Sequence, residues 1–406
     1  MDSAVSTAAR ALTVGDPLAA LKCVALRTDP PALALRGIAM AQLGALEQAR
    51  ALLRRAASAF GDAEPVARAR CVVAQAEVAL AFRDLGGTAR GLEEAVTLLA
   101  QHGDRANAAL GRLVQARRLA LLGQVEAAES ALEQLSLAQA PQRFVALASL
   151  IAADVAMKRV RPKRARQALE RAVAAARAAG VPALVAEVES ARQRLDAPVA
   201  RLLSKGHESE VGLAALERVL ASDELIVDAC RRELRLDKSV VSLVTRPILL
   251  ELAVALAERA PVEVPRDALI LRVFGAKRVN DSHRVRLRVE IGRLRKLLRD
   301  LASLSATASG FVLTPKRGRG LSLLVPPAEG EVSELWALLR GGEAWATSAL
   351  AAALGKSQRA VQRALSELEA DGKVRAAGDG RARRWVLAPG AGFATTMLLV
   401  APGTLG

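Results

Sequence analysis

One stretch of the chain combines basic side chains with the spacing of an amphipathic helix. Ser282–Arg299 carries seven arginine or lysine residues against a single glutamate. Leu287, Ile291, Leu294 and Leu298 recur at i, i+4, i+7 and i+11, which places them on one stripe of a helix. Such a helix can pack on its own domain while it offers positive charge to a polyanion. A solvated basic helix without a partner is the alternative, because charge runs usually form solvated surfaces.

The basic side chains of this helix are the candidate contacts to nucleic acid: Arg284, Arg286, Arg288, Arg293, Arg295, Lys296 and Arg299. Arginine suits this chemistry because its planar guanidinium group pairs with guanine O6 and N7 or with phosphate oxygens. Val285, Val289 and Gly292 lie opposite the apolar stripe. The centre of the outward face is therefore predicted to be small and apolar.

The net charge of +16 is spread unevenly along the 406 residues. Residues 1–223 carry 29 basic and 23 acidic side chains, residues 224–327 carry 20 and 11, and residues 328–406 carry 9 and 8. More than half of the positive excess therefore lies in the middle segment. An uneven excess of this kind is expected when one module faces a polyanion.

The composition favours a core of closely packed helices. Hydrophobic residues make up 52% of the chain, but only six phenylalanines and three tryptophans are present, and tyrosine is absent. Alanine, leucine and valine must therefore fill the core. The length is enough for roughly two to four domains.

Cysteine usage and the chain ends indicate a cytoplasmic protein. Cys23, Cys71 and Cys230 are far apart and fit reduced thiols better than a disulfide framework. The chain does not open with a basic segment followed by an apolar core, so no signal peptide is predicted. Prolines and glycines interrupt the uncharged C-terminal stretch, which argues against a membrane span. We therefore expect a soluble cytoplasmic protein without a membrane segment.

Residues 30–195 alternate amphipathic helical segments with short breaks. Four segments, which begin at Leu46, Leu92, Val125 and Pro162, have similar sequences. They share a small residue in the same place: Ala49, Ala95, Ala128 and Ala165. A period in the mid-thirties, with alanine where helices must approach closely, resembles tetratricopeptide repeats. Such arrays usually present a surface to a peptide or protein. An irregular domain of antiparallel helix pairs is the alternative.

From residue 224 the pattern changes to short strand-like runs, then helices, then strands. The predicted elements are strands at 225–227, 233–236 and 240–243, helices at 247–259, 265–274 and 281–300, and strands at 311–314 and 321–325. The last two strands are expected to form a basic β-hairpin around the segment 315–320. This order predicts a winged helix-turn-helix with an added N-terminal sheet.

The segment 224–326 resembles the effector domain of OmpR/PhoB-type response regulators. The recognition helix of that family ends in V-x-I-x-R-L-R-K-x-L, and Val289–Leu298 reads V-E-I-G-R-L-R-K-L-L. The family's wing ends in R-G-x-G-Y, and Arg317–Leu321 reads R-G-R-G-L. Arg288 and Glu290 replace an acidic residue and a histidine of the family, and leucine replaces the wing tyrosine. The resemblance implies a basic helix in the major groove of DNA, but the family's base preferences do not carry over.

The predicted hairpin adds further candidate contacts. Lys316, Arg317 and Arg319 could reach an adjacent minor groove or its phosphates. Gly318 and Gly320 permit the turn between the strands.

Residues 331–388 repeat the order of a winged helix in another form. Helices are predicted at 332–339, 348–354 and 358–371, with a hairpin around Gly378-Asp379-Gly380. The spacing of small and β-branched residues resembles the wide group of winged helix-turn-helix regulators. The candidate DNA contacts are Gln358, Arg359, Gln362 and Arg363. Because the segment is nearly neutral, dimerisation or protein binding remains the alternative role.

No motif for catalysis or cofactor binding is found in the sequence. Gly355-Lys356-Ser357 resembles the end of a phosphate-binding loop, but Leu350 stands where the first glycine is needed. The three histidines have no metal-ligand spacing with cysteine or carboxylate residues. We therefore expect no enzyme activity, no cofactor and no metal site.

The sequence thus predicts a mainly α fold, with an N-terminal α-helical repeat array followed by two C-terminal α+β winged helix-turn-helix domains. The expected segments are a tetratricopeptide-like repeat domain at 1–200, a linker or capping helix at 201–223, an OmpR/PhoB-type winged helix at 224–327, a second winged helix at 328–390 and a tail at 391–406. We expect a sequence-specific DNA-binding transcriptional regulator. Its partners are double-stranded DNA and a protein on the repeats, and a homodimer is left open. The alternative is an interaction scaffold whose winged helices bind protein or RNA.

Overall fold

The chain is mainly helical, with small sheets. The computed structural model describes residues 3–81, 89–137, 140–204, 206–276, 278–327, 335, 338–339, 345–354, 356–370, 373–377 and 383–387. These residues belong to two compact units. Of the described residues, those up to 195 and those from 373 onward belong to the first unit, and those from 196 to 370 belong to the second.

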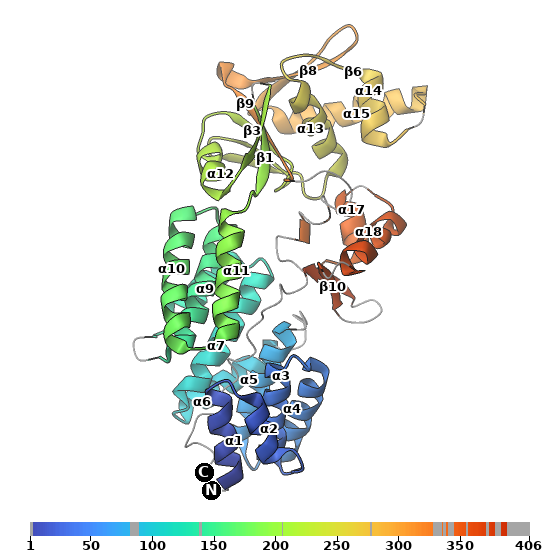
Figure 1. Cartoon of the computed structure of the whole chain (residues 1–406). Coiled ribbons are helices and arrows are strands. Elements are labelled where there is room, and N and C mark those ends of the chain that lie inside the picture. The colour runs from blue at the N-terminus through green and yellow to red at the C-terminus, as the bar shows by residue number, and fades with distance from the viewer. Residues whose placement is uncertain are drawn as a thin grey trace. The chain divides into compact units, whose positions relative to one another are not determined.

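The first unit is built from successive helices that pack against their neighbours in the chain (Figure 1). Its helices are α1 (Ser3–Thr13), α2 (Pro17–Val24), α3 (Pro30–Gln42), α4 (Leu46–Phe60), α5 (Pro65–Ala81), α6 (Ala89–Gln101), α7 (Arg105–Leu121), α8 (Val125–Glu133), α9 (Gln142–Lys158), α10 (Pro162–Ala179) and α11 (Pro182–Asp196). Aspartate caps begin several of them. The Asp29 carboxylate accepts a hydrogen bond from the Ala32 backbone N–H at 3.2 Å, which satisfies a donor at the start of α3.

Small residues allow these helices to approach one another closely. The four alanines that align between the repeated segments are all buried: Ala49, Ala95, Ala128 and Ala165. In α3, a Cβ added at Gly37 would lie 2.7 Å from Leu53 Cγ of α4, closer than real side chains come. The residues at which the sequence predicted close helix contacts therefore lie inside the helix–helix packing.

Three charged residues meet inside this unit. Glu77 of α5 is only 3% exposed, and its Oε2 has no hydrogen-bond partner among the described residues. Nearby, Arg117 of α7 forms an ion pair with Glu187 of α11. Burial raises the pKa of the Glu77 carboxyl well above its usual range; the Arg117 charge opposes this shift and the Glu187 charge adds to it. Glu77 therefore holds its proton in the folded state under conditions in which the unfolded chain has released it.

This retained proton should make the helical unit less stable as the pH rises. Above pH 4.5, the ordinary value for glutamate, the unfolded state binds fewer protons than the folded state, so folding loses up to about 1.4 kcal/mol per pH unit until Glu77 ionises in the fold. We expect Glu77→Gln to remove this dependence and to be more stable than the parent at pH 8. Urea unfolding followed by circular dichroism from pH 5 to 8 measures it, with the exposed Glu94→Gln as the matched control. Identical pH profiles for the Glu77→Gln protein and the parent would contradict the assignment.

The second unit contains two sheets and six α-helices among its described residues. Its elements are β1 (Ala200–Ser204), β2 (His207–Val211), α12 (Leu213–Leu220), β3 (Leu225–Asp228), β4 (Glu233–Leu236), β5 (Ser239–Ser242), α13 (Pro247–Arg259), β6 (Val264–Pro265), α14 (Arg266–Phe274), α15 (Asp281–Leu298), β7 (Ala302–Ala306), β8 (Gly310–Pro315), η1 (Lys316–Gly318), β9 (Leu321–Val325), α17 (Thr347–Leu354) and α18 (Gln358–Ala370). The larger sheet has the strand order β2-β1-β9-β3-β4-β5, and the smaller has β6-β8-β7.

The segment 201–223 differs from the expected linker or capping helix. Its first half forms the hairpin β1–β2, and only its second half is helical, in α12. Strand β1 also pairs antiparallel with β9, and the Arg201 side chain donates a hydrogen bond to the Pro326 carbonyl, 125 residues away. Local sequence patterns do not reveal a strand whose partner lies so far along the chain. The large sheet therefore begins at Ala200.

The expected hairpin between strands 311–314 and 321–325 is wrong. Strand β8 instead pairs antiparallel with β7 and β6, whereas β9 pairs antiparallel with β1 and parallel with β3 in the other sheet. The three central residues of β9 are buried, which is typical of an interior strand and not of a projecting hairpin. Strand β7 was missed because its sequence, A-S-L-S-A, carries little β-forming signal. The basic segment 316–320 therefore connects two sheets.

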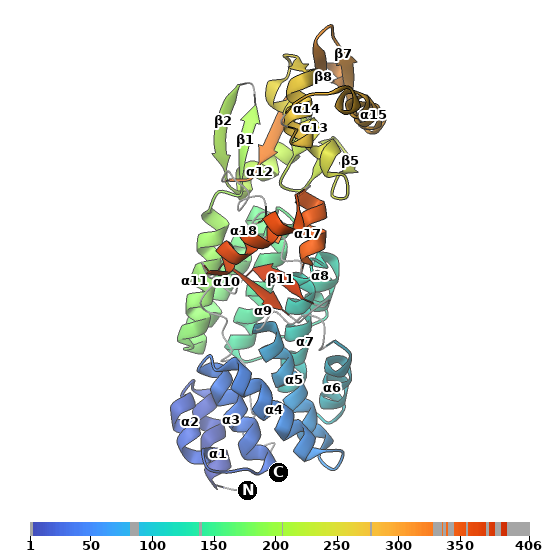
Figure 2. The ribbon, with the colours of Figure 1, turned by 90° about the vertical axis from the view of Figure 1, so that its right-hand side faces the viewer.

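The β7–β8 hairpin is tied to the start of α14. The Arg266 side chain donates hydrogen bonds at 2.8 Å to the carbonyls of Thr307 and Ala308, at the hairpin tip. Gly310 leaves no room for a side chain, since a Cβ there would lie 2.1 Å from the Val264 carbonyl oxygen. The hairpin consequently has a fixed position beside α15 (Figure 2), which packs on β7.

The C-terminal elements are described in part. Ser357 caps α18, since its hydroxyl accepts a hydrogen bond from the Ala360 backbone N–H at 3.2 Å. Strands β10 (Val374–Ala377) and β11 (Arg384–Leu387) pair antiparallel, as predicted. Most of the predicted helix 332–339 and the predicted turn 378–380 lie outside the described residues.

Candidate nucleic-acid interface

Helix α15 is held in place by the apolar stripe that its sequence predicts. The four stripe residues are buried: Leu287, Ile291, Leu294 and Leu298. They belong to one apolar cluster that includes Leu252 of α13 and Leu269 of α14. The helix begins at an asparagine cap, where Asn280 Oδ1 accepts a hydrogen bond from the His283 backbone N–H at 2.9 Å. Its opposite face is left exposed.

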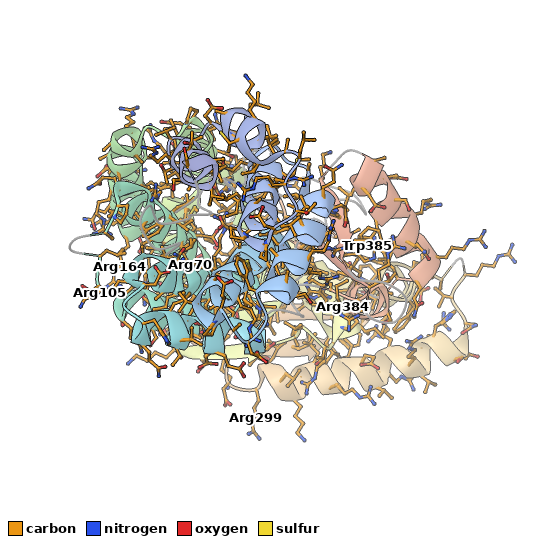
Figure 3. All side chains as sticks on the ribbon, turned by 90° about the horizontal axis from the view of Figure 1, so that it is seen from below. Arg70, Arg105, Arg164, Arg299, Arg384 and Trp385 are labelled. Atoms are coloured by element: carbon orange, nitrogen blue, oxygen red, sulfur yellow. The ribbon has the colours of Figure 1, made fainter. Side chains whose placement is uncertain are left out.

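Three cations on this exposed face are free of intramolecular pairing within the described part of the chain. Arg288, Lys296 and Arg299 are exposed, and no hydrogen bond or ion pair joins their side chains to the described residues. Figure 3 shows Arg299 at the end of α15 with its side chain directed outward. At about 100° per residue the three lie within an arc of roughly 80°. They are therefore available to an external anion.

The other predicted cations of α15 flank this arc and are engaged within the protein. Arg293 donates a hydrogen bond to Glu290 at 2.8 Å, and Arg295 donates one to the Leu304 carbonyl at 3.0 Å. Arg284 lies 3.5 Å from the Asp281 carboxylate. These contacts orient the side chains.

Arg286 has a different kind of partner. Its guanidinium group lies 4.5 Å from the centre of the Phe274 ring, at the end of α14. All four engaged arginines remain exposed, so each keeps donors free for a ligand.

The centre of the outward face is apolar. Val285 is 57% exposed and Val289 is 48% exposed. A Cβ added at Gly292 would meet no atom of the described protein within 4 Å. The spacing of Val285, Val289 and Gly292 predicted this apolar strip, which shares the outward face with Arg288, Lys296 and Arg299.

The predicted wing residues do not form one group. Lys316 is exposed, and its backbone N–H donates to the carbonyl of Leu301 at 3.1 Å, which places it beside the end of α15. Arg319 instead donates hydrogen bonds to the Asp237 carboxylate at 2.6 Å and to the Asp223 carbonyl at 3.2 Å, beside the large sheet. The side chain of Arg317 lies outside the described part of the structure. Lys316 can therefore extend the surface of α15, whereas Arg319 stabilises the connection between the sheets.

The hairpin beside α15 adds polar groups that the sequence did not indicate as contacts. Ser303 and Ser305 of β7 are exposed, and their hydroxyl oxygens lie 3.4 Å apart. The alternating sequence Ser303-Leu304-Ser305 is the only local pattern that indicates two exposed serines, because the intervening Leu304 is buried. Hydroxyls in this position can bind phosphate oxygens.

The predicted contacts of the second helix-turn-helix segment lie together on α18. Gln358, Arg359, Gln362 and Arg363 are all exposed on this helix. Val361, Leu365 and Leu368 form its buried side. The exposed and buried positions thus separate as an amphipathic helix requires.

Comparisons of the chain with protein-family models, with curated proteins and with solved structures found no match in any of the three. Among the described residues, no group of three or more histidine, cysteine, aspartate or glutamate side chains is arranged to hold a metal ion. None of the described helices has the length and apolar character needed to cross a bilayer. The functional assignment therefore depends on the geometry and charge of the chain itself.

Proposed function

We propose that the chain is a DNA-binding transcriptional regulator that inserts α15 into the major groove. The observation that carries this proposal is the exposed face of α15, where Arg288, Lys296 and Arg299 have no partner among the described residues and share the face with an apolar strip. The helix of 18 residues is about 27 Å long and has a width that the major groove of B-form DNA accepts. The apolar stripe of α15 is packed in the protein core, so the cationic face of the helix is exposed to a ligand.

The surrounding elements support the interpretation of residues 200–325 as a winged-helix domain. Helices α13, α14 and α15 share one apolar core, and the β7–β8 hairpin lies against the last of them. In this interpretation the wing is the β7–β8 hairpin, whose tip Thr307-Ala308-Ser309 carries no charge. Phosphate contacts near the wing would then come from hydroxyls and from Lys316.

The helices α3–α10 support a second role in protein contact. Their close packing through small residues and their repeated order favour a tetratricopeptide-like array, which presents surface to a partner and has no catalytic function. The exposed side of α18, with two glutamines and two arginines, favours a second and weaker contact to DNA. The regulator would thus join a protein-docking region to a DNA reader.

Binding of the full chain to a mixed-sequence DNA duplex of about 30 base pairs tests this function. If five to seven phosphates are contacted, the slope of log affinity against log salt should be roughly −4 to −6. Fluorescence anisotropy at several salt concentrations measures it. A duplex RNA of the same length should bind less tightly, because its major groove is too deep and narrow to admit α15. A slope near zero, or equal binding to RNA, would favour the interaction scaffold instead.

A further inference from the structure

The glycine at the centre of the exposed face of α15 has no explanation within the described part of the protein. Gly292 lies in the interior of an 18-residue helix, where glycine is less stable than alanine. Its φ is not in the left-handed region, and a Cβ there would meet no atom of the described residues within 4 Å. Neither backbone conformation nor internal packing therefore requires glycine. The open space over Gly292 does admit the close approach of another molecule.

The residues around Gly292 determine which chemical groups an approaching molecule would contact. Val285 and Val289 lie within roughly 60° of Gly292 around the helix and are 57% and 48% exposed. Arg288, Lys296 and Arg299 lie in the same arc and have no partner among the described residues. A hydrophobic partner protein would leave these three cations desolvated and unpaired, which is costly. Charge complementarity therefore favours duplex DNA, with the cations on phosphates and the strip on the groove floor.

The chemistry of the groove floor then limits the sequence that can be read. Donors and acceptors cover most of the major-groove edge of the bases, and the thymine methyl group is its apolar feature. Val285 and Val289 are about 6 Å apart along the helix axis, close to two base-pair steps. We propose that Gly292 lets the backbone of α15 approach the groove floor, so that Val285 and Val289 contact the methyl groups of two thymines about two base pairs apart. This inference rests on the proposed function and specifies its DNA target.

Selection of duplexes by the full chain, followed by removal of single methyl groups, tests the proposal. The selected site should contain two thymines at this spacing. Replacing either one with deoxyuridine removes only the methyl group and should weaken binding about fourfold, and replacing both should weaken it about 15-fold. Uracil at other positions of the same site should have no effect.

Two variants link the methyl effect to α15. Val289→Ser should lose sensitivity to one of the two uracil replacements, whereas the control Val262→Ser, at a valine that is also about half exposed, should keep both. Gly292→Ala should raise the thermal midpoint of the protein, because alanine is preferred in a helix interior. The same variant should bind the selected site about tenfold more weakly, the scale of one lost base contact. If Gly292 had a purely structural role, one substitution would not be expected to raise the stability of the protein and lower its affinity for DNA.

The outcomes separate this inference from the proposed function. Tight, salt-dependent binding to duplex DNA with equal affinity for thymine and uracil sites would overturn the methyl contacts and leave the proposed function standing. Unchanged DNA affinity of Gly292→Ala would overturn the role of the glycine. Failure of the full chain to bind any DNA duplex would overturn both.

Discussion

Replacing Arg288, Lys296 and Arg299 together with alanine should lower the affinity of the full chain for duplex DNA on the order of 100-fold at physiological salt. Each of these exposed side chains lacks an intramolecular partner within the described part of the chain, so each is available to one phosphate. Three lost phosphate contacts should also make the slope of log affinity against log salt less steep by about 3. Stability should change little, since none of the three side chains is buried.

A matched control is available on the helical array. Arg54, Arg55 and Arg105 are exposed, and replacing all three with alanine removes the same net charge. That control should retain the affinity and the salt slope of the parent protein if α15 supplies the DNA contacts. Equal losses in both triple variants would mean that binding follows total charge. Loss in the control alone would place the DNA on the array.

Moving the start of a DNA-binding fragment from residue 197 to residue 224 should have the next largest effect, which is a loss of folding stability. We expect a fragment of residues 197–327 to fold and to bind DNA. A fragment of residues 224–327 should be less stable by about 3 kcal/mol or more, because it lacks β1 and turns β9 into an edge strand. Leu323 and Leu324 of β9 are fully buried, and burial of each leucine is worth about 1.5–3 kcal/mol.

Urea unfolding of the two fragments, followed by salt-dependent DNA binding of the longer one, checks this prediction. The longer fragment serves as the control for the absence of the helical array. Equal unfolding midpoints would show that the β1–β2 hairpin contributes nothing to the sheet. A stable longer fragment without DNA affinity would show that residues outside 197–327 are needed for binding.

The helical elements could be predicted from the sequence because their signals are local. In α15 the spacing of four apolar residues gave both the helix and its buried side, and the residues opposite the stripe are exposed as expected. A proline begins α13 and a serine caps α18, and both residue types are local signals for the start of a helix. A helix satisfies its backbone within a few residues, so its boundaries and its apolar face are written in one short segment.

Strand partners and side-chain engagement were decided only by the tertiary structure. The sequence located strand β9 correctly, but its neighbours β1 and β3 come from distant parts of the chain. Hydrogen bonding between distant strands leaves no periodic pattern in the sequence that would identify the partner. For the same reason the sequence grouped Arg319 with the DNA contacts, whereas the fold pairs it with Asp237. Composition and spacing determined the cationic helix and its apolar strip. Which of its cations stay free depended on the carboxylates and carbonyls that folding brought beside them.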